Sequence, residues 1–280
     1  MNDRRHIPEE EYRADQGVNK STLWEMRKSP LHYKYSLTHP SEDTPALKLG
    51  RAVHMAILQP EEFQKHYILA PNIDRRTNAG KALWSDFLLQ AEGKEVLTAD
   101  DYETVMAMYD AVYGNPEKGI IGNQAAQNLL DGAETEVSLF WTDNMTGIDC
   151  KCRLDAIKCV GDKTIVIDLK TTTDAKTDSF MRDAIKLGYD VQEAHYVRGV
   201  RYVAADDSKI EWYWLVIEKK PPYAINIIKS TDPFRDRGTW QLIDLMEKLK
   251  NCIDTDEWPG YGMNELVLPE WALIPDGDDD

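Results

Sequence analysis

The sequence has few cysteines. Its 280 residues include four, and none of them form a CxxC pair. Four are too few for a disulfide framework in a chain of this length, and the missing CxxC spacing argues against a cysteine metal site. Cys150 and Cys152 alternate in a strand-like stretch, so we expect them to be buried free thiols.

Long hydrophobic runs are also missing. No apolar segment approaches the roughly 18 residues that a membrane-spanning helix needs. The N-terminal residues Met-Asn-Asp-Arg-Arg-His lack the apolar segment of a signal peptide. We therefore expect a cytoplasmic protein with no membrane partner. Because 42% of its residues are hydrophobic, the chain is able to bury a substantial core.

Positive charge is missing from one end of the chain. Residues 251–280 contain nine acidic residues and no Lys or Arg, whereas residues 1–60 contain nine Lys and Arg against eight Asp and Glu. The formal net charge of −16 is therefore concentrated toward the C-terminus. The net charge affects the solubility of the protein more than the chemistry of a candidate site. It is compatible both with a nucleic-acid partner and with a metal site built from carboxylates.

The hydrophobic pattern changes along the chain. Helical spacing predominates at first, and a helix is predicted over Pro45–Gln59. Asn19 or Ser21 is the expected cap of an earlier helix, and Thr98 is the expected cap of a later one. Strand-like alternation begins near Glu134. We expect one compact domain made of a helical N-terminal part (1–130), an α/β core (131–250) and a loose acidic tail (251–280).

Charged residues end two neighbouring strands of a predicted three-strand meander. Asp155 lies at the end of one strand, and Asp168 and Lys170 lie at the end of the next, after a buried β-branched run. Because residues i and i+2 of a strand share a face, Asp168 and Lys170 project together, while Leu169 points into apolar packing. Burying such charges costs free energy unless they are paired with each other or bind a ligand such as a metal ion.

Polar residues on two predicted helices have spacings that place them on one face. Gly50 and His54 share a helical stripe, and we expect the glycine to let a neighbouring element pack closely over the histidine. Gln192 and Tyr196 share a face of a later helix. The alternative to a functional role is a buried structural histidine for His54, and an ordinary helix surface for Gln192 and Tyr196.

A basic loop precedes another predicted helix. Arg75, Arg76 and Lys81 make it locally positive in an acidic chain. Arginines close to a helix N-terminus suit an anion such as a phosphate, and a solvated loop is an equally good interpretation.

Four short motifs occur in a fixed order along the chain: Gly-Arg-Ala-Val-His at 50–54, Arg-Leu-Asp at 153–155, Asp-Leu-Lys at 168–170 and Gln-Glu-Ala-His-Tyr at 192–196. They resemble the GRxxH, GxxD, DxK and QxxxY blocks of the RecB-like branch of the PD-(D/E)xK nuclease superfamily. Lys-Cys-Arg-Leu-Asp replaces the glycine-led second block. The Arg-Arg-Thr-x-x-Gly-Lys loop at 75–81 and the segment Ser29-Pro30-Leu-His-Tyr are similar to RecE-type exonucleases of prophage recombination systems. The resemblance covers roughly residues 17–250.

The resemblance implies an α/β fold, with a PD-(D/E)xK core whose central mixed sheet is flanked by helices and a helical N-terminal elaboration. It implies Mg²⁺ as the cofactor, with Mn²⁺ also accepted. The expected metal ligands are His54, Asp155, Asp168 and the backbone carbonyl of Leu169, with Glu136 as a further candidate that is otherwise a solvated strand residue. The expected catalytic residues are Asp155, Asp168, Lys170, Gln192 and Tyr196. The expected DNA contacts are Arg51, Arg75, Arg76, Thr77 and Lys81.

The same resemblance implies a Mg²⁺-dependent exodeoxyribonuclease. It would digest linear double-stranded DNA from the 5′ end and leave 3′ overhangs for recombination by a strand-annealing partner, and it would act as a homo-oligomeric ring. A structure-specific or restriction-type endonuclease and a non-catalytic DNA-binding scaffold are the alternatives. An iron–sulfur nuclease needs cysteines clustered after the core, where only Cys252 is present.

Overall fold

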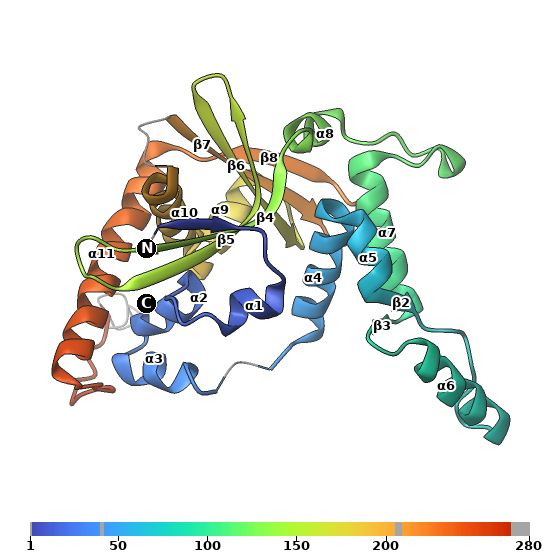
Figure 1. The fold of residues 1–280 in the computed structure, drawn as a ribbon, viewed down its shortest axis with the longest axis horizontal. Helices are drawn as coiled ribbons and strands as arrows, with labels where there is room; N and C mark the ends of the chain where they lie inside the picture. Colours follow the sequence, from blue (N-terminus) through green and yellow to red (C-terminus); the bar gives the residue numbers. More distant parts are fainter. Residues whose placement is uncertain (1, 40–41, 205–208, 270–280) are drawn as a thin grey trace, which may run out of the picture.

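The computed structural model describes residues 2–39, 42–204 and 209–269. Its centre is a mixed sheet of six strands in the order β1-β4-β5-β6-β7-β8 (Figure 1). The strands are β1 (Asp3–Arg5), β4 (Glu134–Thr142), β5 (Asp149–Val160), β6 (Lys163–Thr172), β7 (Lys209–Glu218) and β8 (Ile225–Lys229). β6 and β7 are parallel, and the other neighbouring strands are antiparallel. The predicted α/β class, mixed sheet and meander are confirmed.

Helices cover both faces of this sheet. They are α1 (Glu9–Ala14), α2 (Lys20–Leu23), α3 (Pro30–Ser36), α4 (Pro45–Leu58), α5 (Pro60–His66), α6 (Asn78–Gln90), α7 (Ala99–Tyr113), α8 (Gln124–Leu130), α9 (Thr177–Leu187), α10 (Tyr189–Ala204) and α11 (Asp232–Thr255), with 3-10 helices η1 (Trp24–Arg27) and η2 (Pro116–Lys118). A small parallel sheet joins β2 (Tyr67–Leu69) to β3 (Glu95–Leu97). Asn19 and Thr98 cap α2 and α7 as predicted. Within the described ranges, no helix is long and apolar enough to cross a membrane.

Each face of the sheet has its own hydrophobic core. On one face, α2, α3, α9, α10 and α11 bury side chains that include Trp141 and Trp214. On the other face, α4, α5 and α7 bury side chains that include Ile167 and Leu169. Residues 1–130 are therefore divided between the two faces, and they also supply β1, β2 and β3. Cys150 and Cys152 are buried free thiols, as predicted.

Helix α10, which carries Gln192 and Tyr196, is held against α11 by two ion pairs whose carboxylates are buried. Asp190 pairs with Arg237, and the Glu193 carboxylate accepts a hydrogen bond from Nε of Arg235 at 2.8 Å. Asp190 and Glu193 are both fully buried. Close backbone contact adds to these pairs, because a Cβ at Gly238 would lie 2.0 Å from the carbonyl oxygen of Asp190. The position of α10 over the sheet is therefore fixed from its outer side.

The predicted acidic tail is partly packed. α11 continues to Thr255, inside the range predicted as tail. Beyond it, Trp258 stacks on Tyr33 at 5.9 Å, and the backbone N–H of Leu31 donates to the carbonyl of Pro259 at 3.1 Å. The prediction of a loose tail is thus wrong for this part, because aromatic contacts hold it against α3. Residues 270–280 of the predicted tail lie outside the described residues.

Candidate active site

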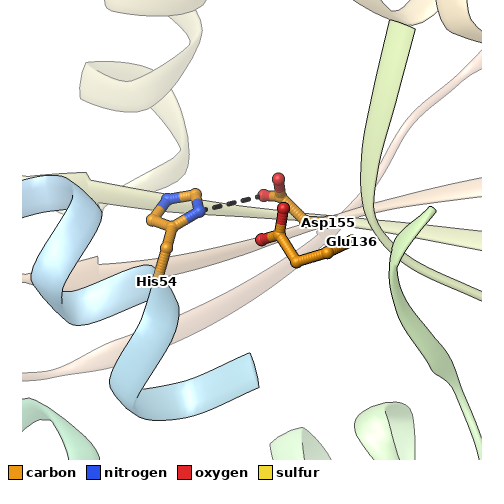
Figure 2. A group of neighbouring side chains, drawn as sticks. All are labelled: His54, Glu136 and Asp155. Atoms are coloured by element: carbon orange, nitrogen blue, oxygen red, sulfur yellow. Dashed lines mark ion pairs between the residues drawn. The ribbon is translucent and has the colours of Figure 1, made fainter. Parts of the chain in front are cut away.

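Three side chains with metal-ligand atoms converge beside the central sheet (Figure 2). His54 comes from α4, Glu136 from β4 and Asp155 from β5. Their ligand atoms all lie within 4.8 Å of one another. Nδ1 of His54 is 3.4 Å from Oδ2 of Asp155. All three side chains are only partly buried, so the cluster is partly exposed to solvent.

Glu136 reaches this cluster from an unusual backbone conformation. The neighbouring Val137 pairs regularly with Leu154 of β5, but Glu136 has a φ of 53°. This left-handed region is unfavourable for residues other than glycine, and such strain is concentrated at functional sites. Glu136, the further candidate ligand that the sequence could also explain as a solvated strand residue, therefore belongs to the group of ligand atoms.

Asp168 and Lys170 form an ion pair on β6, beside this cluster. The other carboxylate oxygen of Asp168 accepts a hydrogen bond from the side-chain amide of Gln192 on α10. Oδ2 of Asp155 accepts a hydrogen bond of 2.8 Å from the backbone N–H of Leu169, which joins β5 to β6 just beyond their last paired residues, Ala156 and Ile167. The prediction that Asp155 ends its strand is wrong, because β5 runs from Asp149 to Val160 and pairs with β4 on both sides of this residue. Among the described residues, Asp168 is not a member of the three-residue group, and its proposed metal contact stays a prediction.

Burial shifts the pKa values of these groups. It lowers the pKa of His54 to about 4, with Lys170 adding to the effect, so the imidazole is neutral near pH 7 and is able to donate a lone pair to a metal. Burial and the nearby Asp155 raise the pKa of Glu136 to about 8. Burial raises the pKa of Asp168 to about 6, although the Lys170 ammonium opposes the rise.

The raised carboxylate pKa values show that negative charge is unfavourable at this site in the protein alone. A divalent cation would remove that penalty by pairing with the carboxylates. The donor set of two carboxylates and one neutral imidazole suits Mn²⁺, and Mg²⁺ through the oxygen atoms. The residues present therefore fit a divalent metal ion.

Two lysines share one aromatic ring next to Asp168. Nζ of Lys170 lies 4.8 Å from the ring centroid of Tyr189, and Nζ of Lys20 lies 6.0 Å from the same centroid. Burial disfavours the Lys170 ammonium, but Asp168 and Tyr189 outweigh that effect and raise its pKa. Burial and Lys170 lower the pKa of Lys20 to about 8. No spacing rule singles out Lys20, because its neighbours come from remote parts of the chain.

Tyr196 lies one turn after Gln192 on the same helix and is partly buried. Its ring packs edge-on against Trp212, with centroids 6.0 Å apart. Burial raises its pKa well above the usual range, so the phenol is neutral, and the charges of Asp168 and Asp155 contribute to the rise. Gln192 therefore contacts the Asp168 carboxylate directly, whereas Tyr196 lies against the aromatic core.

The surroundings of His54 on α4 differ from the expectation. A Cβ added at Gly50 would meet nothing within 4 Å, so the prediction that a neighbour packs closely on this glycine is wrong. Arg51, a predicted DNA contact, forms two hydrogen bonds to the Asp43 carboxylate, at 2.7 and 2.8 Å.

The predicted basic loop lies at the start of α6, which projects away from the central sheet (Figure 1). The guanidinium of Arg75 stacks over Trp84 at 4.4 Å, and Arg76 pairs with Asp74. Thr77 caps the helix, and Lys81 is exposed. The structure therefore does not bring this loop to the metal-ligand cluster of the same chain.

Comparisons with known proteins agree with this architecture. A solved structure from Eubacterium rectale, described as a candidate exonuclease, is similar to this chain with a TM-score of 0.56 and 15% identity, over 93% of this chain and 97% of that chain. At that identity the likeness shows the fold alone. Another, the structure of SSO0001, has a TM-score of 0.30 and 16% identity over 72% of this chain and 86% of that chain, which is too low to inform the fold.

No curated protein matches the sequence. The family model described as a PDDEXK-like domain of unknown function (DUF3799) matches residues 20–267. That range includes the central sheet from β4 to β8 and the three cluster residues, and it confirms the predicted PD-(D/E)xK core. Because the match spans most of the chain, this protein belongs to the family of PDDEXK-like domains.

Proposed function

We propose that this chain is a metal-dependent DNA exonuclease. The observation that carries the proposal is the convergence of His54, Glu136 and Asp155 beside the Asp168–Lys170 pair in a PDDEXK-like domain. A structural role alone would not require a partly exposed group of two acids and one neutral imidazole at a strained strand position. Such a donor set, once it holds a divalent cation, suits phosphodiester hydrolysis.

His54, Glu136, Asp155 and Asp168 would hold Mg²⁺ or Mn²⁺, and the carbonyl of Leu169 would be a further ligand. When bound, the metal supplies Lewis-acid activation of water and of the phosphate. A carboxylate oxygen has more than one lone pair, so the contacts of Asp168 with Lys170 and Gln192 leave it able to bind a cation.

The remaining residues act on the phosphate and on one another. Lys170 keeps its positive charge because its pKa is raised, and it stabilises the negative charge that develops on the phosphate oxygens. Gln192 orients the Asp168 carboxylate through its hydrogen bond. Tyr196 supports the helix face that presents Gln192. Lys20, which shares the Tyr189 ring with Lys170, adds a second positive charge on the same side.

We assign linear double-stranded DNA as the substrate, with digestion from the 5′ end and a 3′ overhang that serves recombination through an annealing partner. The order of the four motifs and the RecE-like loop at 75–81 support this assignment. Since α6 projects from the body of the chain, its loop would contact DNA outside the cluster of its own chain. A ring of several copies would place such loops around a duplex.

Cleavage of end-labelled DNA tests this function. Linear duplexes labelled at either the 5′ or the 3′ end are incubated with Mg²⁺ or Mn²⁺ beside a covalently closed circle. We expect early release of the 5′ label, an intact circle, and no release by the Asp155→Asn variant. Cleavage of the circle would instead indicate an endonuclease, and DNA binding without cleavage under either metal would indicate a scaffold.

The basic loop has its own test. If it holds a terminal phosphate, the double substitution Arg75→Ala/Arg76→Ala removes the preference for 5′-phosphorylated ends while metal binding stays unchanged. An unchanged preference would refute that role for the loop.

A further inference from the structure

A segment that precedes the family match lies next to the metal-ligand cluster. This N-terminal arm, residues 3–15, contains β1 and α1, whereas the family match begins at residue 20. β1 pairs with β4, and Arg5 lies opposite Ser138, two residues from Glu136. The arm therefore runs along the strand that contributes a proposed ligand.

Arg153 connects the arm to the cluster. It lies on β5, two residues before Asp155, and its guanidinium donates a hydrogen bond to the backbone carbonyl of Ile7 in the arm. Nε of the same guanidinium lies 3.4 Å from Oε2 of Glu136. The Arg153 side chain is 14% exposed and that of Glu136 is 21% exposed. At such burial, solvent screens the attraction between the two charges only partly.

Contacts from the arm also fix the direction of Arg153. Its guanidinium lies 5.3 Å from the ring centroid of Tyr12, which belongs to α1. Lys151 holds the same helix end, because its Nζ donates to the backbone carbonyls of Tyr12 and Asp15 at 2.7 and 2.6 Å. Its Nζ also lies 4.7 Å from the Tyr12 ring. Arg153 is thus held between the arm on one side and Glu136 on the other.

Glu136 needs such a partner. Its carboxylate lies close to the carboxylate of Asp155, which repels it, and its backbone is held at a φ of 53°. Because it is partly exposed, its side chain could otherwise turn toward water. A cation fixed behind it opposes both the repulsion and the rotation.

We propose that Arg153 is a positioning residue of the metal site, and that the N-terminal arm sets its orientation. It holds the Glu136 carboxylate toward His54 and Asp155, and it does not itself touch the metal or the DNA. This role rests on the proposed function, because it requires that the cluster of His54, Glu136 and Asp155 binds a divalent metal. If Arg153 only anchored the arm, its loss would change folding stability and leave metal affinity as it is.

Isothermal titration of the folded full-length chain with Mn²⁺ alone tests this role. We expect Arg153→Gln to weaken Mn²⁺ binding about 10- to 100-fold, as is typical when the partner of a metal ligand is removed. Arg153→Lys keeps the charge but not the fork that reaches both Ile7 and Glu136, so we expect a smaller loss. Arg201→Gln, on the exposed surface of α10, is the matched control and should bind as the wild type does.

A double substitution separates positioning from general damage. In a Glu136→Gln background, Arg153→Gln should weaken Mn²⁺ binding little further, because the residue acts through Glu136. Wild-type affinity in a folded Arg153→Gln chain, or equal losses in the two backgrounds, would overturn the proposal. Absence of Mn²⁺ binding by the wild type would overturn both this proposal and the proposed function, whereas binding by the wild type with no effect of Arg153 would overturn this one alone.

The contribution of the arm has a separate readout. Tyr12→Leu removes the ring beneath the guanidinium but keeps an apolar side chain, and we expect it to weaken Mn²⁺ binding in the same direction as Arg153→Gln. Unchanged affinity in that variant would overturn the role of the arm.

Discussion

Replacement of His195 by glutamine should remove an acid-sensitive part of the folding free energy. His195 lies on α10 and is 1% exposed. Its Nε2 lies 3.1 Å from the carbonyl oxygen of Lys151, and its ring centroid lies 4.8 Å from that of Trp141. Burial lowers its pKa from 6.5 to about 4, so the folded protein holds this imidazole neutral where the unfolded chain protonates it.

The sign and the size of the effect follow from these two pKa values. Between pH 6.5 and about 4 the unfolded chain binds more protons at this residue than the folded chain does. The stability contribution is therefore complete above pH 6.5 and is lost as the pH falls toward 4. The full loss is about 3 kcal/mol, of which about 2 kcal/mol is lost by pH 5.

Urea denaturation at about pH 7.5 and about pH 5 measures this loss. Other groups titrate in the same range, so the quantity to compare is the difference between proteins. We expect the wild type to lose about 2 kcal/mol more than His195→Gln on acidification. His66→Gln, which removes an exposed imidazole from α5, should behave as the wild type does. Equal losses in the wild type and His195→Gln would refute the argument from burial.

The remaining predictions concern packing, charge burial and metal. Gly238→Ala should lower the free energy of unfolding by at least about 2 kcal/mol, because the added Cβ would lie 2.0 Å from the Asp190 carbonyl oxygen. Gly50→Ala should raise the free energy of unfolding by about 0.5 to 1 kcal/mol, because the added Cβ would meet nothing within 4 Å. Equal urea midpoints for Gly238→Ala and Gly50→Ala would contradict both predictions. Arg235→Ala leaves the buried Glu193 without its cation and should lower the free energy of unfolding by about 3 to 5 kcal/mol in the same assay. Arg235→Lys should lower it less. A loss below about 1 kcal/mol in Arg235→Ala would show that the fold does not need this ion pair. Mn²⁺ should raise the melting temperature of the wild type and EDTA should reverse the rise, whereas an unchanged melting temperature at saturating Mn²⁺ would argue against a site in the folded state.

Local patterns predicted the features of the fold that depend on near neighbours in the sequence. The cap residues Asn19 and Thr98 start helices because their side chains accept hydrogen bonds from the next turn. The i, i+2 rule placed Asp168 and Lys170 on one face of β6, with Leu169 in the opposite core. Such features need no knowledge of the remaining chain.

Features that depend on remote segments could not be predicted in this way. A glycine in the sequence does not show whether another element packs against it. Nothing packs against Gly50, because a Cβ added there would meet no atom within 4 Å. Glu136 has a left-handed backbone between Thr135 and Val137, which both pair regularly with β5, and the strand pattern of the sequence does not reveal this irregularity. Lys20 and Lys170 meet only because both reach Tyr189, and no spacing connects them.

The position of the basic loop shows the same limit. Arg75 and Arg76 have the composition of an anion site, but composition contains no information on where α6 points. Their present partners are Trp84 and Asp74, which belong to the same short stretch of chain. Placing this loop relative to the cluster required the packing of α5, α7 and the small β2–β3 sheet.

The most direct test of the central claim is Mn²⁺ binding followed by electron paramagnetic resonance, in which bound Mn²⁺ loses the sharp signal of the free ion. The wild type should bind Mn²⁺, and Asp155→Asn, which keeps the shape of the side chain but not its charge, should bind at least about tenfold more weakly. Asp183→Asn, on the exposed surface of α9, should bind as the wild type does. Equal Mn²⁺ binding by the wild type and Asp155→Asn would contradict a metal site at His54, Glu136 and Asp155.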